Sequence, residues 1–236
     1  MNRVALITGV GPGLGAALAR RFAREGFRVG LVARKPDFIE ALAREISASG
    51  ASALSLVADV SRPAEITAAV NQVRATLGSV GVLIHNASGS PGEGLLKTMP
   101  EEFEQSWRVA ALAGFVCARE TASDMVAAGA GVMLFTGATS SVRGGGWLAF
   151  SSAKFALRGL AQSLARELWP RGVHVAHVVI DGLIAPSADR EASDMEDEPA
   201  LDPDRIADAY WHLATQDRSA WTLELDLRPH TEQFYD

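Results

Sequence analysis

A glycine-rich turn near the N-terminus has the composition of a diphosphate-binding loop. It reads Thr8-Gly9-Val10-Gly11-Pro12-Gly13-Leu14-Gly15, directly after an apolar run and directly before an amphipathic stretch. Glycines let the backbone turn tightly and approach a diphosphate, and the free N–H groups that begin a helix point at the anion. Such a turn can also be an ordinary tight connection. Its position after a first strand favours a dinucleotide site.

Two basic residues indicate which dinucleotide would fit. The second apolar run ends in Val32-Ala33-Arg34-Lys35. An acid at this point accepts hydrogen bonds from the ribose hydroxyls of NAD, whereas a base suits the additional 2′-phosphate of NADP. The sequence therefore predicts NADP rather than NAD. The alternative is that Arg34 and Lys35 are ordinary loop charges, and the nearby Asp37 complicates the choice.

These residues resemble the short-chain dehydrogenase/reductase family, whose fingerprint is Thr-Gly-x-x-x-Gly-(Ile or Leu)-Gly. Every fixed position is matched, and the resemblance covers nearly the whole chain. The stretch His85-Asn86-Ala87-Ser88 matches the family's Asn-Asn-Ala-Gly only in part, and Asp181 replaces the proline of its Pro-Gly turn. The cofactor-binding residues that the resemblance implies are Gly9, Gly11, Gly13, Leu14, Gly15, Arg34, Lys35, Asp59, Val60, Asn86, Ala87, Ser88, Lys154, Gly182 and Ile184.

The same resemblance implies a catalytic site that lacks most of its polar groups. Family members carry a tyrosine and, four residues later, a lysine on one helix face, where such residues are neighbours. This chain has Phe150 and Lys154. Counting back 13 residues from Phe150 gives Gly137 instead of the substrate-binding serine, and Ala111 aligns with the relay asparagine. A phenylalanine cannot donate a proton, and a positioned general acid contributes about 10²–10⁴ to a rate.

Other groups could take over the proton transfer. Thr139 and Ser140 lie near the empty serine position, although loop hydroxyls are more often turn or cap residues. Asp181 could be a base or could cap its turn, and His85 could transfer protons or be a buried core group. The predicted function is therefore an NADP(H)-dependent oxidoreductase of a small carbonyl or alcohol substrate, with an atypical relay. The alternative is an inactive nucleotide-binding or regulatory protein.

Alternating apolar runs and amphipathic stretches must position these residues. Runs such as Val4-Ala5-Leu6-Ile7 are continuously apolar, as strands covered on both faces require. The pattern predicts an α/β fold with one doubly wound, mostly parallel, seven-stranded Rossmann-type sheet and helices on both faces. Strands are predicted at Val4–Thr8, Arg28–Ala33, Ala53–Ala58, Val80–His85, Val132–Thr136, Val173–Ile180 and Trp221–Asp226. Helices are predicted near Leu14–Arg24, Pro36–Ala48, Pro63–Leu77, Pro100–Ala127, Trp147–Leu168 and Pro203–Thr215.

Length and composition fit one domain over residues 1–236. The chain has 22 basic and 28 acidic residues, a net charge of −6, which argues against nucleic-acid binding. Without an apolar run of about 18 residues we expect no membrane span, and the single cysteine fits a cytoplasmic protein. Residues 185–203 are strongly acidic, which predicts a flexible insertion or a lid over the substrate. No metal-ligand spacing is found, and the long helices predict a homodimer or homotetramer.

Overall fold

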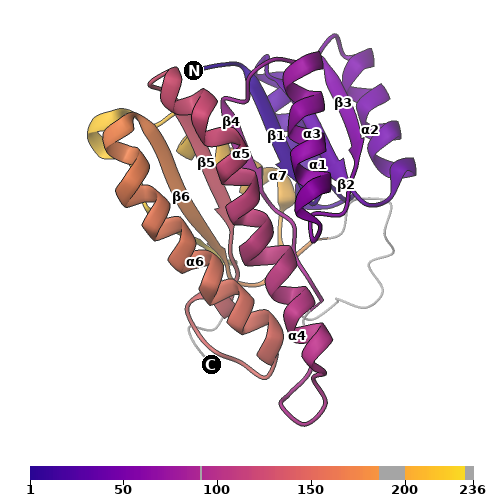
Figure 1. Ribbon diagram of the computed structural model, residues 1–236, viewed down its shortest axis with the longest axis vertical. Helices are drawn as coiled ribbons and strands as arrows, with labels where there is room; N and C mark the ends of the chain where they lie inside the picture. Colours follow the sequence, from indigo (N-terminus) through magenta and orange to yellow (C-terminus); the bar gives the residue numbers. More distant parts are fainter. Residues whose placement is uncertain (91, 186–199, 232–236) are drawn as a thin grey trace.

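Seven parallel strands form one sheet in the order β3-β2-β1-β4-β5-β6-β9 (Figure 1). The computed structural model describes residues 1–90, 92–185 and 200–231. The predicted doubly wound fold is confirmed, because every neighbouring pair in this sheet is parallel. The strands are β1 (Val4–Thr8), β2 (Arg28–Ala33), β3 (Ala53–Val57), β4 (Val82–His85), β5 (Gly131–Thr136), β6 (Val173–Ile180) and β9 (Glu224–Leu227).

Helices cover both faces of the sheet and divide the core into two layers. One layer packs α1 (Leu14–Arg24), α2 (Pro36–Ala48) and α7 (Pro203–Ala214) against the sheet. The other contains α3 (Pro63–Thr76), α5 (Ala113–Ala127) and α6 (Leu148–Leu168), which lie in front of the sheet in Figure 1. Proline occupies the first position of α2, α3 and α7, where its missing N–H has no helical partner to lose.

The predicted helix over 100–127 contains a local irregularity. It begins as α4 (Pro100–Trp107), passes through the π-helical turn η1 (Arg108–Leu112) and continues as α5. Single π-turns within α-helices are rare, and those that are found frequently lie at functional sites. None of the described helices has the length and apolar character needed to cross a membrane.

The last strand begins three residues later than the sequence predicts. The ring of Trp221 stacks on His174 at a centroid distance of 4.9 Å, and the Thr222 carbonyl accepts a hydrogen bond from the His174 ring. Trp221 and Thr222 therefore contact β6 through the His174 ring, and strand pairing starts at His177 and Glu224.

Two short strands were not predicted. β7 (Leu183–Ile184) and β8 (Ala200–Leu201) pair in parallel as a separate ribbon. They flank the acidic segment, of which residues 186–199 lie outside the described residues. The prediction of a lid or insertion over 185–203 therefore stays a prediction.

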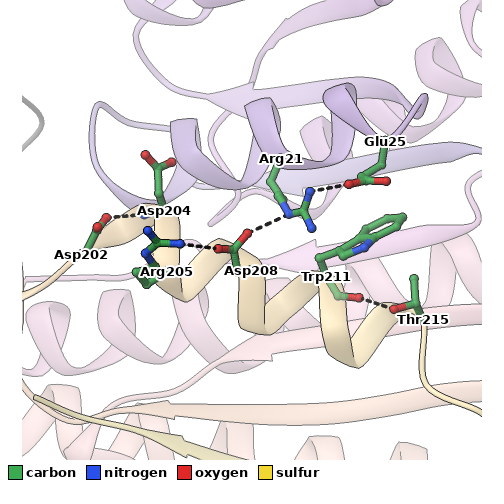
Figure 2. Close-up of polar contacts among 8 residues, drawn as sticks. All are labelled: Arg21, Glu25, Asp202, Asp204, Arg205, Asp208, Trp211 and Thr215. Atoms are coloured by element: carbon green, nitrogen blue, oxygen red, sulfur yellow. Dashed lines mark hydrogen bonds and ion pairs between the residues drawn. The ribbon is translucent and has the colours of Figure 1, made fainter. Parts of the chain in front are cut away.

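Helix α7 is attached to α1 by an aromatic and ionic contact (Figure 2). The Trp211 ring meets Phe22 and Phe27 edge to face, with centroids 5.4 and 5.9 Å away. The Arg21 guanidinium lies 5.4 Å from the Trp211 ring and pairs with Asp208 at 3.0 Å. Because the aromatic cluster removes much more apolar surface from water than the ion pair does, we expect the tryptophan to dominate this contact.

Replacing this tryptophan should destabilise the protein substantially. We expect Trp211→Ala to lower the free energy of unfolding by about 2–4 kcal/mol, because it leaves a cavity between α1 and α7. Asp208→Asn, which removes only a half-exposed charge, should cost less than about 1 kcal/mol. Urea unfolding of both variants measures the difference. Equal losses would contradict this ranking.

Candidate active site

The turn between β1 and α1 lies against the end of β4. Gly9 has φ +73°, and a Cβ on it would stand 2.5 Å from the Ala87 Cα. The Asn86 side-chain amide donates to the Gly9 carbonyl at 3.1 Å. Only glycine combines this backbone conformation with so close an approach, so residue 9 fixes the two strand ends side by side.

Gly11 and Gly13 lie beside open space. A Cβ on Gly11 or Gly13 would meet no atom within 4 Å, and both residues line a cavity of about 400 Å³. Gly15 is different, because a Cβ there would lie 2.7 Å from the Val10 Cα. No described side chain caps the start of α1. An open, glycine-lined helix N-terminus of this kind fits a diphosphate.

A second cavity, of about 630 Å³, adjoins the first and shares Gly9, Gly11 and Asn86 with it. Arg34 and Lys35 line its wall after β2. The implied cofactor residues are divided between the two cavities. Ser88 lines both cavities. The larger one is also lined by Asp59, Val60 and Ala87, and the smaller one by Gly13, Leu14, Gly15, Lys154, Gly182 and Ile184.

Asp59 is ionised in the larger cavity. Burial opposes its charge, but the Ser61 amide, which donates at 2.9 Å, and the charges of Arg34 and Arg62 hold the pKa of this carboxyl below its ordinary value. This end of the cleft therefore combines two bases with one hydrogen-bond acceptor.

Lys154 is buried at the opposite end of the cleft. Its side chain is 2% exposed, and its Nζ donates to the Thr136 carbonyl at 2.9 Å. Burial lowers the pKa of Lys154 to about 8. The Phe150 ring lies 5.4 Å from Nζ, one helical turn earlier on α6. This corner can therefore hold a proton on a lysine but has no hydroxyl at position 150.

The two residues whose hydroxyls were proposed as substitutes line neither cavity. The Thr139 hydroxyl donates to the Asp181 carboxylate, and Ser140 is buried. Asp181 also forms an ion pair with Arg228 at 2.9 Å. Asp181 therefore contacts a guanidinium and a hydroxyl, whereas the sequence suggested either a base or a turn cap.

His85 is a buried core residue. Its Nε2 donates to the Ala110 carbonyl at 3.0 Å, so its Nδ1 accepts from the Thr8 hydroxyl at 2.9 Å. Burial and, secondly, the Lys154 charge lower the pKa of His85 to about 4. The ring is therefore neutral and joins β1, β4 and the π-turn that contains Ala111.

Three residues near the cleft were not identified from the sequence. Tyr210 lies on α7, and its hydroxyl forms a hydrogen bond with Thr136 Oγ1 at 2.7 Å. Arg228 follows β9, and His177 lies on β6 behind Gly137. Their roles depend on which strands are neighbours, and no local motif marks any of them.

Comparison with known proteins agrees with this geometry. The family model for short chain dehydrogenases matches residues 3–197. A 3alpha-hydroxysteroid dehydrogenase of Mediterraneibacter gnavus is 28% identical over 236 residues, covering 95% of this chain and 94% of its own.

Solved structures extend the likeness to the whole fold. A short-chain dehydrogenase from Rhodopseudomonas palustris is 38% identical with a TM-score of 0.84, over 96% of this chain and 98% of that one. A metagenomic short-chain oxidoreductase in complex with NADP is 32% identical, also with a TM-score of 0.84, over 96% and 97% of the two chains. With its sequence matched along residues 3–197 and its fold along nearly its full length, this chain belongs to the short-chain dehydrogenase family.

Proposed function

We propose that this protein is an NADP(H)-dependent oxidoreductase that interconverts a small carbonyl compound and its alcohol through an atypical proton relay. The observation that carries the proposal is the pair of adjoining cavities that runs from Arg34, past the open glycines, to the buried Lys154. When bound, NADP(H) supplies or accepts a hydride at its nicotinamide ring. The residues of this chain bind that cofactor and manage the proton.

The binding roles follow from charge and space. Arg34 and Lys35 would bind the 2′-phosphate, and Gly11 and Gly13 would leave room for the diphosphate. By the family resemblance, Lys154 would bind the nicotinamide ribose. The NADP complex of the metagenomic oxidoreductase, 32% identical to this chain, supports the choice of nucleotide.

The proton is the difficult part of the reaction. Phe150 cannot donate one, and Asp181 is paired with Arg228. The Lys154 ammonium is the proton-carrying group that lines the cleft beside Phe150, and water next to it would pass the proton to the substrate oxygen. Without a side-chain general acid we expect turnover to be slow, by about 10²–10⁴ relative to a complete relay.

A nucleotide-binding protein without turnover is the second candidate. Phe150 favours it, because the ring places carbon where a hydroxyl would be needed. In that case Lys154 would serve binding alone.

Turnover and its pH dependence separate the two candidates. We expect the protein to oxidise NADPH against a panel of aldehydes, ketones and quinones, with kcat/KM falling as the pH rises through about 8, because the Lys154 ammonium loses its proton there. Lys154→Met should abolish turnover, whereas the exposed Lys97→Met should leave the profile unchanged. NADPH binding without oxidation of any compound in the panel would refute the oxidoreductase and support the second candidate.

The nucleotide preference should depend on the two bases after β2. We expect Arg34→Ala to weaken NADPH binding about 10- to 100-fold, the cost of one charge-assisted contact to phosphate, with little change for NADH. Arg44→Ala serves as the control, because Arg44 is an exposed residue of α2 that lines neither cavity. Fluorescence titration with both nucleotides measures the effect, and an equal loss for NADPH and NADH would rule out a contact to the 2′-phosphate.

We further propose that the protein is a homo-oligomer assembled through α4, α5 and α6. Four aromatic side chains on these helices, Phe103, Trp107, Phe115 and Phe155, are 38–43% exposed. The three helices lie side by side on one face (Figure 1). Large exposed apolar groups on one face are typical of a protein interface.

Charges in this face should separate the subunits. We expect Phe115→Glu combined with Phe155→Glu to convert the dimer or tetramer into a monomer, because buried unpaired carboxylates are costly. Val57→Glu, at the exposed far edge of the sheet, should leave the assembly intact. Sedimentation velocity measures the mass. A wild-type protein that sediments as a monomer at micromolar concentrations would disprove the assembly.

A further inference from the structure

Asp181 connects the carboxyl ends of three neighbouring strands. It follows β6, and its backbone N–H donates to the Leu227 carbonyl of β9 at 2.9 Å. Its carboxylate accepts a hydrogen bond from the Thr139 hydroxyl, after β5, and forms an ion pair with Arg228, directly after β9, at 2.9 Å. Since β6 pairs with β5 on one side and β9 on the other, one side chain joins all three segments.

The ion pair is largely shielded from water. The Arg228 side chain is 13% exposed, and that of Asp181 is 9% exposed. The same guanidinium donates to both carboxylate oxygens of Asp226, at 3.0 and 2.7 Å, which fixes its plane. Removing Arg228 would leave the buried Asp181 carboxylate without its cation, which is costly.

The turn that follows Asp181 forms part of the wall of the smaller cavity. Gly182, Ile184 and Ala185 all line this cavity. Gly182 has φ +133°, and a Cβ on it would lie 3.0 Å from the Pro229 Cδ. Gly182 therefore lies between the cavity and the C-terminal segment that carries the arginine.

The loop after β5 forms another part of the same wall. Gly137 and Ala138 line the smaller cavity together with Lys154. Thr139, the next residue, is bonded to Asp181. The two bases after β2 line the larger cavity instead. In the proposed binding mode, the contacts of Asp181 therefore support the nicotinamide half of the cofactor, at the lysine end of the cleft.

We propose that Arg228 is a positioning residue for the nicotinamide half of NADP(H): its ion pair with Asp181 holds the turn over residues 182–185 in place as a wall of the cleft. This inference rests on the proposed binding of NADP(H). Arg228 itself lines neither cavity, so it acts through Asp181 and the turn. A side chain from the C-terminal segment thus controls how one half of the cofactor is held.

A fragment of the cofactor separates this role from a general loss of stability. The compound 2′,5′-ADP carries the adenosine and the 2′-phosphate but no nicotinamide. We expect Arg228→Met to weaken NADPH binding about 10-fold and to leave 2′,5′-ADP binding unchanged, because only the nicotinamide half loses its support. Isothermal titration calorimetry measures both dissociation constants. Equal losses for the two ligands, or no loss for NADPH, would overturn the proposal.

Two further arginine variants complete this comparison. Arg228→Lys keeps the charge but lacks the planar fork that reaches both Asp226 and Asp181, so we expect a smaller loss, again confined to NADPH. This variant replaces the methionine one if circular dichroism shows that Arg228→Met does not fold. Arg205→Met, at an 81% exposed position of α7, should change neither dissociation constant.

A double-mutant cycle tests whether the ion pair itself is responsible. We expect Asp181→Asn to weaken NADPH binding about as much as Arg228→Met, and the double variant to lose no more than either single variant. Additive losses would show that the two residues act separately and would overturn the proposal. If the wild-type protein binds neither NADPH nor 2′,5′-ADP, the proposed function fails and this inference with it. If it binds both and Arg228→Met weakens both equally, this inference alone fails.

Discussion

The close approach of Gly9 to the Asn86–Ala87 backbone is the constraint on which the cleft depends. Strands β1 and β4 are neighbours in the sheet although 77 residues separate Thr8 from His85, and those two side chains bond across the strands. β2 lies on the other side of β1, so the chain order reverses at this point. Crevices at such reversals, beyond the carboxyl ends of parallel strands, are where α/β proteins bind ligands. A side chain on residue 9 would push the two strand ends apart.

The opposite end of the cleft is organised by buried polar groups instead of glycines. Lys154 reaches the Thr136 carbonyl from α6, while Tyr210 reaches the Thr136 hydroxyl from α7. One residue at the end of β5 is thus held from both layers. Arg228, which follows β9, forms an ion pair with Asp181, which follows β6. The C-terminal strand therefore contributes to the site although it lies at the edge of the sheet.

The predicted sheet is confirmed, and the glycine-rich turn lies along the cleft, because both depend on local patterns. Continuous apolar runs require cover on both faces, and the glycines of residues 9–15 are consecutive in the chain. The reactive end depends on residues that only the strand order brings together. The contact between His177 and Gly137 follows from the register of β5 and β6, and the pair of Asp181 and Arg228 from that of β6 and β9. Neither register can be predicted from the hydrophobic periodicity of the sequence.

Binding of the dinucleotide is the central claim, since every proposed role of Arg34 and Lys154 assumes it. Isothermal titration calorimetry of the wild-type protein with NADPH and NADH tests it most directly. The account predicts one saturable NADPH site per chain and weaker binding of NADH. No heat of binding with either nucleotide, from a protein that circular dichroism shows to be folded, would contradict it.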